Sequence, residues 1–275
     1  TDPDPLAEAL ALPVASGLVG AQDAPLFAWV ENAAGVRNIW VGARGRPARR
    51  LTAYTEDDGL QIYSLAFSRD GASLAFVRGG DGEFPDAERL PNTGAATTAP
   101  LQQVSVVPAD GGPAVAIGRG HSPVFSPDGD RLAFTRRGEL WLWARGSEAR
   151  RLATVDGEIN RLSWSPDGAR LLFSEDRGEH SFVAILDVAG PRLRDLDPGL
   201  GQSIEPIFSP GGDQIAFIRT MPPPPGAAPD AGRYWSVRIV EAPGGQARTL
   251  WSAPAGQGSR YAGTRSRNLF GSRDA

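Results

Sequence analysis

Side chains that could act as nucleophiles, bases or metal ligands are few in this chain. It contains no cysteine and only two histidines, His121 and His180, which lie 59 residues apart. Neither histidine has a second histidine or a carboxylate at the spacing of a metal-binding motif. A serine hydrolase of the α/β type needs Gly-x-Ser-x-Gly, and the nearest match, at Ser122, continues with proline and valine. We interpret Ser122 as a structural residue, and the sequence predicts no catalytic residue, no cofactor and no metal site.

Carboxylates and glycine-rich turns give no stronger signal. The segment Glu56-Asp57-Asp58 could bind a cation or an amine, but a polar turn before a strand explains it equally well. The run Gly79-Gly80-Asp81-Gly82 lacks the lysine and the following helix of a phosphate-binding loop. A metal-dependent enzyme such as a lyase is therefore the weakest class, and one tightly bound ion per chain would be needed to support it.

A motif that combines an aromatic residue, a serine, a turn and an apolar strand recurs along the chain. Its copies begin at Phe67, Phe125, Trp164 and Phe208, at spacings of 58, 39 and 44 residues. In the copy Ser-Pro-Asp-Gly, proline presets φ, aspartate can bond its own backbone, and glycine takes the positive φ that closes the reversal. Periods of about 40 to 50 residues with several strands each are typical of β-propeller blades. We predict an all-β chain, a β-propeller of four-stranded antiparallel blades.

The repeats divide the chain into about five blades and the start of a sixth. Residues 1–20 are expected to precede the propeller and to include a short helix, and the propeller covers 21–275. Two positions remain for the innermost strand of the first blade: it lies either within residues 23–52, as in this scheme, or over residues 13–19. An incomplete ring leaves unpaired sheet edges that can pair with another chain, so an oligomer is one expectation. The expected blades are 23–52, 61–117, 120–153, 158–196, 203–250 and a partial one at 258–275.

The second strand of each repeat carries one side-chain pattern. A leucine or isoleucine and a phenylalanine share one face, and a small or apolar residue between them points to the other face. Apolar residues on both faces are expected of a sheet that lies between two neighbouring blades. The first set is Leu74, Leu132, Leu171 and Ile215, the second is Phe76, Phe134, Phe173 and Phe217, and the third is Ala75, Ala133, Leu172 and Ala216.

Two insertions depart from the repeat, at residues 79–100 and 221–230. Each lies between the second and third strands of its blade, which places both on the same face of a propeller. Insertions on one face of a repeat protein usually mark its binding face. The proline-rich second insertion is expected to be an extended spacer. In the first, a solvated loop and a partner-facing role explain the sequence equally well, and the candidate residues are Asp81, Glu83, Phe84 and Asp86.

Arginines end the second strand in three blades, at Arg78, Arg136 and Arg219. They could form a charged rim that meets anionic groups of a partner or the carboxylate of a peptide. The simpler interpretation is that a polar residue ends each apolar strand. His121 falls at the repeat position of Tyr63, Asn160 and Ile204, so we expect a rim or packing residue rather than a base.

Composition excludes some partners. The 275 residues carry a net charge of −4, which gives no reason to expect nucleic acid or an anionic membrane as partner. No apolar run approaches the length of a membrane span. The 34 glycines and 24 prolines supply the many turns that a propeller needs.

Several segments resemble known propellers. The Ser-Pro-Asp-Gly repeats with Leu-Ala-Phe strands are similar to those of TolB and of the prolyl oligopeptidase family. The closer resemblance is to the amino-terminal propeller of bacterial, dipeptidyl-peptidase-like members of that family, and it covers nearly the whole chain from about Leu12. The segments that carry it are Trp29–Val41, Leu51–Gly59, Phe76–Asp81, Glu83–Asp86 and Gly258–Tyr261.

This resemblance implies a non-catalytic domain that caps and gates a serine peptidase. The partners it implies are a carboxy-terminal α/β-hydrolase domain of the same parent chain, which would carry the Ser-Asp-His triad, and a peptide substrate. The paired glutamates that hold a substrate amino terminus in the dipeptidyl-peptidase branch have no match here. A periplasmic or secreted location is favoured over a cytoplasmic one. The alternative is a TolB-like propeller that acts as a protein-binding scaffold.

Overall fold

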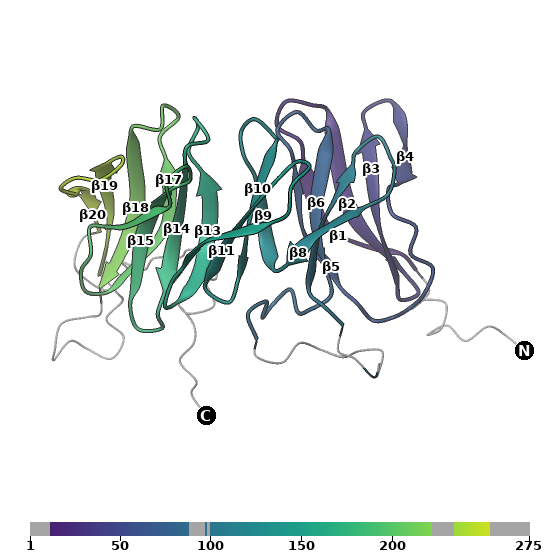
Figure 1. Ribbon diagram of the computed structural model, residues 1–275, viewed down its shortest axis with the longest axis horizontal. Helices are drawn as coiled ribbons and strands as arrows, with labels where there is room; N and C mark the ends of the chain where they lie inside the picture. The colour runs from purple at the N-terminus through teal and green to yellow at the C-terminus, as the bar shows by residue number, and fades with distance from the viewer. Residues whose placement is uncertain (1–11, 88–96, 98–99, 222–233, 254–275) are drawn as a thin grey trace, which may run out of the picture. The chain divides into compact units, whose positions relative to one another are not determined.

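Strands account for all the regular structure that can be described. The computed structural model describes residues 12–87, 97, 100–221 and 234–253, and these contain twenty strands and no helix. The chain divides into two compact units, Thr1–Thr154 and Val155–Ala275, each of which is described by itself. Within each unit the strands follow one another as antiparallel meanders (Figure 1). The short helix that the sequence predicts over residues 6–12 lies almost wholly outside the described residues.

The first unit contains three four-stranded sheets, which we call blades one to three. In every blade the strands pair in sequence order, so each sheet is a simple meander. Blade one consists of β1 (Val14–Gly20), β2 (Leu26–Ala33), β3 (Val36–Ala43) and β4 (Arg46–Arg50). Blade two consists of β5 (Ile62–Phe67), β6 (Ser73–Arg78), β7 (Gln103–Pro108) and β8 (Val115–Arg119). Blade three consists of β9 (His121–Phe125), β10 (Arg131–Arg136), β11 (Glu139–Ala144) and β12 (Arg150–Thr154).

The second unit contains two more meanders, blades four and five. A single parallel bridge, Ser181 to Gln202, joins them into one eight-stranded sheet. Blade four consists of β13 (Glu158–Trp164), β14 (Arg170–Asp176), β15 (Ser181–Asp187) and β16 (Arg192–Leu196). Blade five consists of β17 (Gln202–Phe208), β18 (Gln214–Met221), β19 (Tyr234–Glu241) and β20 (Arg248–Ser252). The expected sixth blade at 258–275 and the proline-rich run 222–230 lie outside the described residues.

Blade one starts earlier than predicted, because residues 1–20 were expected to precede the propeller. Strand β1 pairs with β2, from Val14 opposite Asn32 to Gly20 opposite Phe27. Residues 14–20 therefore belong to the sheet, and of the two alternatives the innermost strand near residues 13–19 is the correct one. The preamble prediction was wrong here because the residues of β1, Val-Ala-Ser-Gly-Leu-Val-Gly, lack the alternation of apolar and polar types that marks other strands.

The repeated serine motif closes the turn between the first two strands. In blade three the Ser126 hydroxyl donates to the Asp128 carboxylate and accepts the N–H of Arg131 at 3.0 Å. The N–H of Gly129 donates to the Ser126 carbonyl at 2.9 Å, and Gly129 has a φ of 75°. The hydrogen bond from the Ser126 hydroxyl is the largest of the effects that lower the pKa of Asp128. The motif recurs because each turn needs these same bonds, which are structural.

Each innermost strand also contains the same irregularity. A β-bulge interrupts its pairing with the second strand in all five described blades. One residue at the bulge has a left-handed backbone, with φ between 51° and 63°. Only blade one has glycine there, although the left-handed region is costly for other residues. The five residues are Gly17, Ser64, Ser122, Arg161 and Glu205.

The predicted side-chain pattern of the second strands forms the core. All four phenylalanines of the pattern are at most 1% exposed. Leu74 and Phe76 of β6 pack against blade one, whereas Ala75 and Val77 face the cluster that contains Phe134 of blade three. Blade two is thus apolar on both faces and lies between two neighbours, as the sequence predicts. This packing fixes the ends of the strands, from which the loops of the candidate site project.

Candidate functional site: the insertion of blade two

Arg78 ends β6 and is held by groups that precede β5. Its guanidinium forms an ion pair with Asp58 and lies 4.2 Å from the ring centroid of Tyr54. Burial raises the pKa of the Tyr54 hydroxyl, partly offset by the positive charge of Arg78. The Arg78 side chain is only 24% exposed. The arginine therefore ties the segment before β5 to the start of the insertion.

The insertion opens with a tight turn that only glycine permits. Gly79 has a φ of 83°, and a β-carbon there would lie 2.4 Å from the carbonyl oxygen of Leu101. The Asp81 carboxylate then accepts the N–H groups of Glu83 at 2.7 Å and Phe84 at 3.2 Å. These bonds place Phe84 at the surface, where it is 57% exposed. The first part of the insertion thus presents an aromatic side chain between acidic residues.

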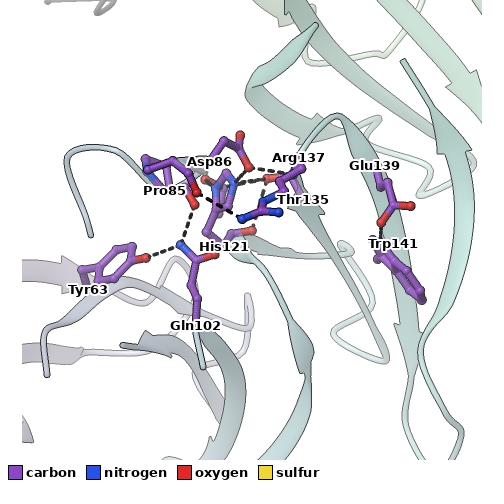
Figure 2. Close-up of polar contacts among 11 residues, drawn as sticks. Tyr63, Pro85, Asp86, Gln102, His121, Thr135, Arg137, Glu139 and Trp141 are labelled. Carbon is purple, nitrogen blue, oxygen red and sulfur yellow. Dashed lines mark hydrogen bonds and ion pairs between the residues drawn. The ribbon is translucent and has the colours of Figure 1, made fainter. Parts of the chain in front are cut away.

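A buried acid–histidine pair fixes the insertion to blade three. Nε2 of His121 lies 2.8 Å from Oδ1 of Asp86, and the two side chains are 3% and 11% exposed. The same carboxylate oxygen accepts the N–H of Arg137 at 2.6 Å, and the Arg137 guanidinium donates to the carbonyl of Ala87 at 3.2 Å. Figure 2 shows that these groups converge from the insertion, β9 and the β10–β11 turn.

The electrostatics of Asp86 favour its ionised form. Burial by itself raises the pKa of this carboxyl. The hydrogen bond and charge of His121, together with the N–H of Arg137, outweigh burial and lower the pKa of Asp86 below its ordinary value. A buried carboxylate that receives these donors is stable as an anion and holds the insertion in place.

A second anchor attaches the insertion to blade two itself. Nε2 of Gln102 donates to the Tyr63 hydroxyl at 2.7 Å and to the Pro85 carbonyl at 2.9 Å (Figure 2). The side-chain oxygen of Gln61 accepts the N–H of Gly82 at 3.0 Å. Residues 79–87 are therefore bonded at both sides of Phe84 and are not a freely solvated loop.

Arg136 and Arg219 are placed in different surroundings. Arg136 lines a cavity of about 420 Å³ within blades two and three, together with Phe134 and Trp141. Arg219 in the second unit donates to Ser203 at 2.7 Å and forms an ion pair with Asp197 at 3.2 Å. Burial lowers the pKa of the Arg219 guanidinium, and it is 12% exposed. Arg219 thus has internal partners, as Arg78 does, while contact of any of the three arginines with a partner stays a prediction.

Sequence reasoning found the insertion but missed its anchors. It placed Asp86 in the loop and expected His121 to be a rim or packing residue, without connecting the two. The residues lie 35 apart in the sequence, and nothing in their local patterns links them. One signal for the anchors was available in the sequence. The repeat position that is apolar in blade five, at Ile204, carries polar side chains in blades two and three, at Tyr63 and His121.

The arrangement around His121 contains hydroxyl groups as well as the carboxylate. Nδ1 of the ring lies 3.0 Å from Oγ of Ser122 and 3.2 Å from Oγ1 of Thr135. A buried ring enclosed in this way serves as an anchor, because a substrate atom does not reach it. Within the described ranges, no three His, Cys, Asp or Glu side chains are placed to hold a metal ion. None of the described segments forms a helix that could cross a membrane.

Comparison with known proteins shows the fold. No protein-family model and no curated protein sequence matches the chain. A putative TolB from Agrobacterium tumefaciens is similar in structure, with a TM-score of 0.50, 19% identity, and coverage of 90% of this chain and 84% of that one. A prolyl endopeptidase is similar with a TM-score of 0.61 and 16% identity, over 90% of this chain and 37% of that one.

A further similar structure is the β-propeller domain of the Trilobed protease from Pyrococcus furiosus, which is described as having an open velcro topology. Its TM-score is 0.51 at 16% identity, over 71% of this chain and 60% of that one. The chain therefore has the β-propeller fold, with several four-stranded blades, as predicted. It spans little more than a third of the length of the prolyl endopeptidase.

Proposed function

We propose that this chain is the gating propeller of a serine peptidase of the prolyl oligopeptidase type. In this proposal the bond-breaking groups belong to a carboxy-terminal α/β-hydrolase domain of the same parent chain, and the propeller limits which peptides reach them. The propeller itself is not catalytic. The observation that carries the proposal is the blade-two insertion, which is bonded on both sides and holds Phe84 at the surface.

A prearranged loop suits a gate because little conformational entropy is lost when it meets a peptide. Phe84 offers an apolar contact, and the neighbouring Asp81 and Glu83 can repel or attract charged side chains of a substrate. The fold likeness to a prolyl endopeptidase and to the propeller domain of a protease is consistent with this role. A periplasmic or secreted location stays a prediction, which fractionation of the source cells would test.

The kinetics of the parent protein test the gate. We expect the reading frame to continue into a domain with Gly-x-Ser-x-Gly, and the full product to cleave a short peptide faster than a long one with the same cleavage site. Asp86→Ala releases the insertion from blade three and should raise kcat/KM for the long peptide relative to the short one. Glu241→Ala, which removes an exposed carboxylate from the end of β19 and leaves both anchors intact, is the control. The proposal fails if no hydrolase domain follows or if Asp86→Ala leaves the ratio unchanged.

A TolB-like binding scaffold is the second candidate. It is supported by the structural likeness to a putative TolB, 84% of whose length the chain covers. This function predicts a stable protein partner for the purified chain and no peptidase activity in the parent product. Partner binding that is lost in Asp86→Ala, in the absence of a hydrolase domain, would favour the scaffold over the gate.

A further inference from the structure

Neighbouring blades within each unit pack by one rule. In blade two, Ala75 and Val77 of the second strand lie on a face that receives Leu132 and Phe134, from the second strand of blade three. The contacts of blade one with blade two, and of blade four with blade five, are of the same kind. We call the face at the positions of Ala75 and Val77 the receiving face of a blade. The residues at the positions of Leu132 and Phe134, on the opposite face of a blade, are its projecting pair.

The receiving face of blade five is apolar and partly open. Ala216 and Ile218 of β18 occupy the positions of Ala75 and Val77, but they are partly exposed, whereas both counterparts in blade two are 0% exposed. Ile207 on β17 lies opposite Ala216 and is 63% exposed. A cavity of about 430 Å³ opens on this face. The same face continues over three more apolar residues that are partly or largely exposed, Val237, Ile239 and Trp251.

The projecting pair of blade one is open as well. Phe27 and Trp29 of β2 form this pair, because Ala28 between them faces blade two. The first position of the pair is 0% exposed in blades two, three and five, whereas Phe27 is 51% exposed and Trp29 is partly exposed. Trp40 of β3 lies opposite Trp29 and extends the apolar surface.

Chance exposure does not account for these two surfaces. Single apolar residues on a protein surface are common and need no partner. Here they gather on two sheet faces, at repeat positions that are buried where a neighbouring blade of the same unit covers them. One surface is a receiving face and the other carries a projecting pair, so the chain supplies both halves of a blade-to-blade contact.

We propose that copies of this chain associate head to tail, with Phe27 and Trp29 of one copy against the receiving face of blade five in the next. The contact repeats the packing that joins blades two and three. Because the two surfaces differ, the interface is heterologous, and the copies either close into a ring or continue as a chain. The proposal involves neither the insertion of blade two nor a hydrolase domain, so it goes beyond the proposed gate.

Sedimentation velocity of the purified chain over a wide range of concentrations tests the proposal. We expect the mean mass to rise with concentration above the mass of one chain. Phe27→Asp blocks one surface and Ile207→Asp blocks the other, and each should weaken association at least about a hundredfold, since an unpaired charge is costly in an apolar contact. Both side chains are more than half exposed, so the fold should tolerate the changes. An equimolar mixture of the two variants should form a dimer and nothing larger, because each supplies the surface that the other lacks.

The matched control is Leu200→Asp, which places the same charge at a 69% exposed apolar residue outside both surfaces. It should change the association by less than about twofold. The proposal is overturned if the unmodified chain stays monomeric, if either of the other variants associates like the control, or if their mixture stays monomeric. A longer parent product that stays monomeric would also overturn it, since other blades of the same chain would then cover the two surfaces.

Hydrogen exchange of the unmodified chain gives a result that does not depend on the folding of a variant. Peptides that cover β2 and β17 should exchange more slowly at high protein concentration than at low concentration, because the contact opposes their local opening. Exchange in these peptides that is independent of concentration would contradict the proposal.

Discussion

The buried bond network of Asp86 gives the sharpest test of how the insertion is held. Asp86→Ala removes the acceptor of two hydrogen bonds, from Nε2 of His121 at 2.8 Å and from the N–H of Arg137 at 2.6 Å. His121 is 3% exposed at its side chain, so its ring nitrogen does not regain a water partner without a local opening. A buried donor left without a partner costs about 1–3 kcal/mol. The bond from the Arg137 N–H is exposed and water can replace it, so the loss of the His121 bond should set the cost, at about 1–3 kcal/mol.

Hydrogen–deuterium exchange read by mass spectrometry measures this cost locally. If the insertion and the β9 strand open together, 1–3 kcal/mol corresponds to about 5- to 150-fold faster exchange in peptides that cover residues 79–87 and 119–125. Peptides from blade five, which belongs to the other compact unit, serve as the internal reference and should exchange at an unchanged rate.

Asp81→Ala is the matched control, since it removes a carboxylate from the same insertion. Its two hydrogen bonds go to exposed N–H groups that water can satisfy, so we expect a cost below about 1 kcal/mol. Equal exchange in the two variants, or no acceleration in Asp86→Ala, would refute the reasoning that a buried anchor holds the insertion.

Four further outcomes are expected. The pKa of Asp86 is lowered in the folded protein, so the carboxylate stabilises the fold above its ordinary pKa of 3.8. This stabilisation is lost as the pH falls through the lower pKa of the folded state. Urea titrations should therefore show the stabilities of the wild type and Asp86→Ala converging below about pH 4. Phe134→Ala should cost about 3–5 kcal/mol in urea unfolding, whereas Phe84→Ala, at a 57% exposed site, should cost less than about 0.5 kcal/mol, and similar costs would contradict the assigned core. Ser126→Ala should raise the pKa of Asp128 toward its ordinary value in an NMR titration, since the serine hydroxyl is the main cause of its lowering, while Ser147→Ala should leave it unchanged. Gly71→Ala should lower the melting temperature more than Gly129→Ala. Both residues have φ near 75°, where alanine in place of glycine costs about 1 kcal/mol. Only at Gly71 would the new β-carbon also lie 2.8 Å from another atom, the β-carbon of Ala24.

The repeat made most of the fold predictable, because its information is local. The Ser-Pro-Asp-Gly turn determines its own geometry within six residues, as the bonds of Ser126 show. The alternation of Leu74, Ala75 and Phe76 gives the two faces of β6 without knowledge of the neighbours. Strand β1 was harder to predict, because its exposed residues carry no alternation, and only its pairing with β2 defines it.

The candidate site was predictable only in part. A departure from the repeat is visible in a sequence, and it pointed to residues 79–100. The anchors were not visible, because the contact between Asp86 and His121 depends on how blades two and three pack side by side. The same holds for Arg78 and Asp58, which are 20 residues apart and meet only when β6 pairs with β5. Packing between blades in the first case and strand pairing in the second, rather than any local motif, decided which polar groups met.

The proposed function assigns this propeller to a serine peptidase whose reactive serine lies elsewhere in the parent chain. Labelling of the native protein in its source cells with a fluorophosphonate probe, followed by mapping of the labelled peptide, tests it most directly. We expect a label on a product that contains these 275 residues, attached to a serine outside them. A label within these residues, such as on Ser122, or an unlabelled product would contradict it.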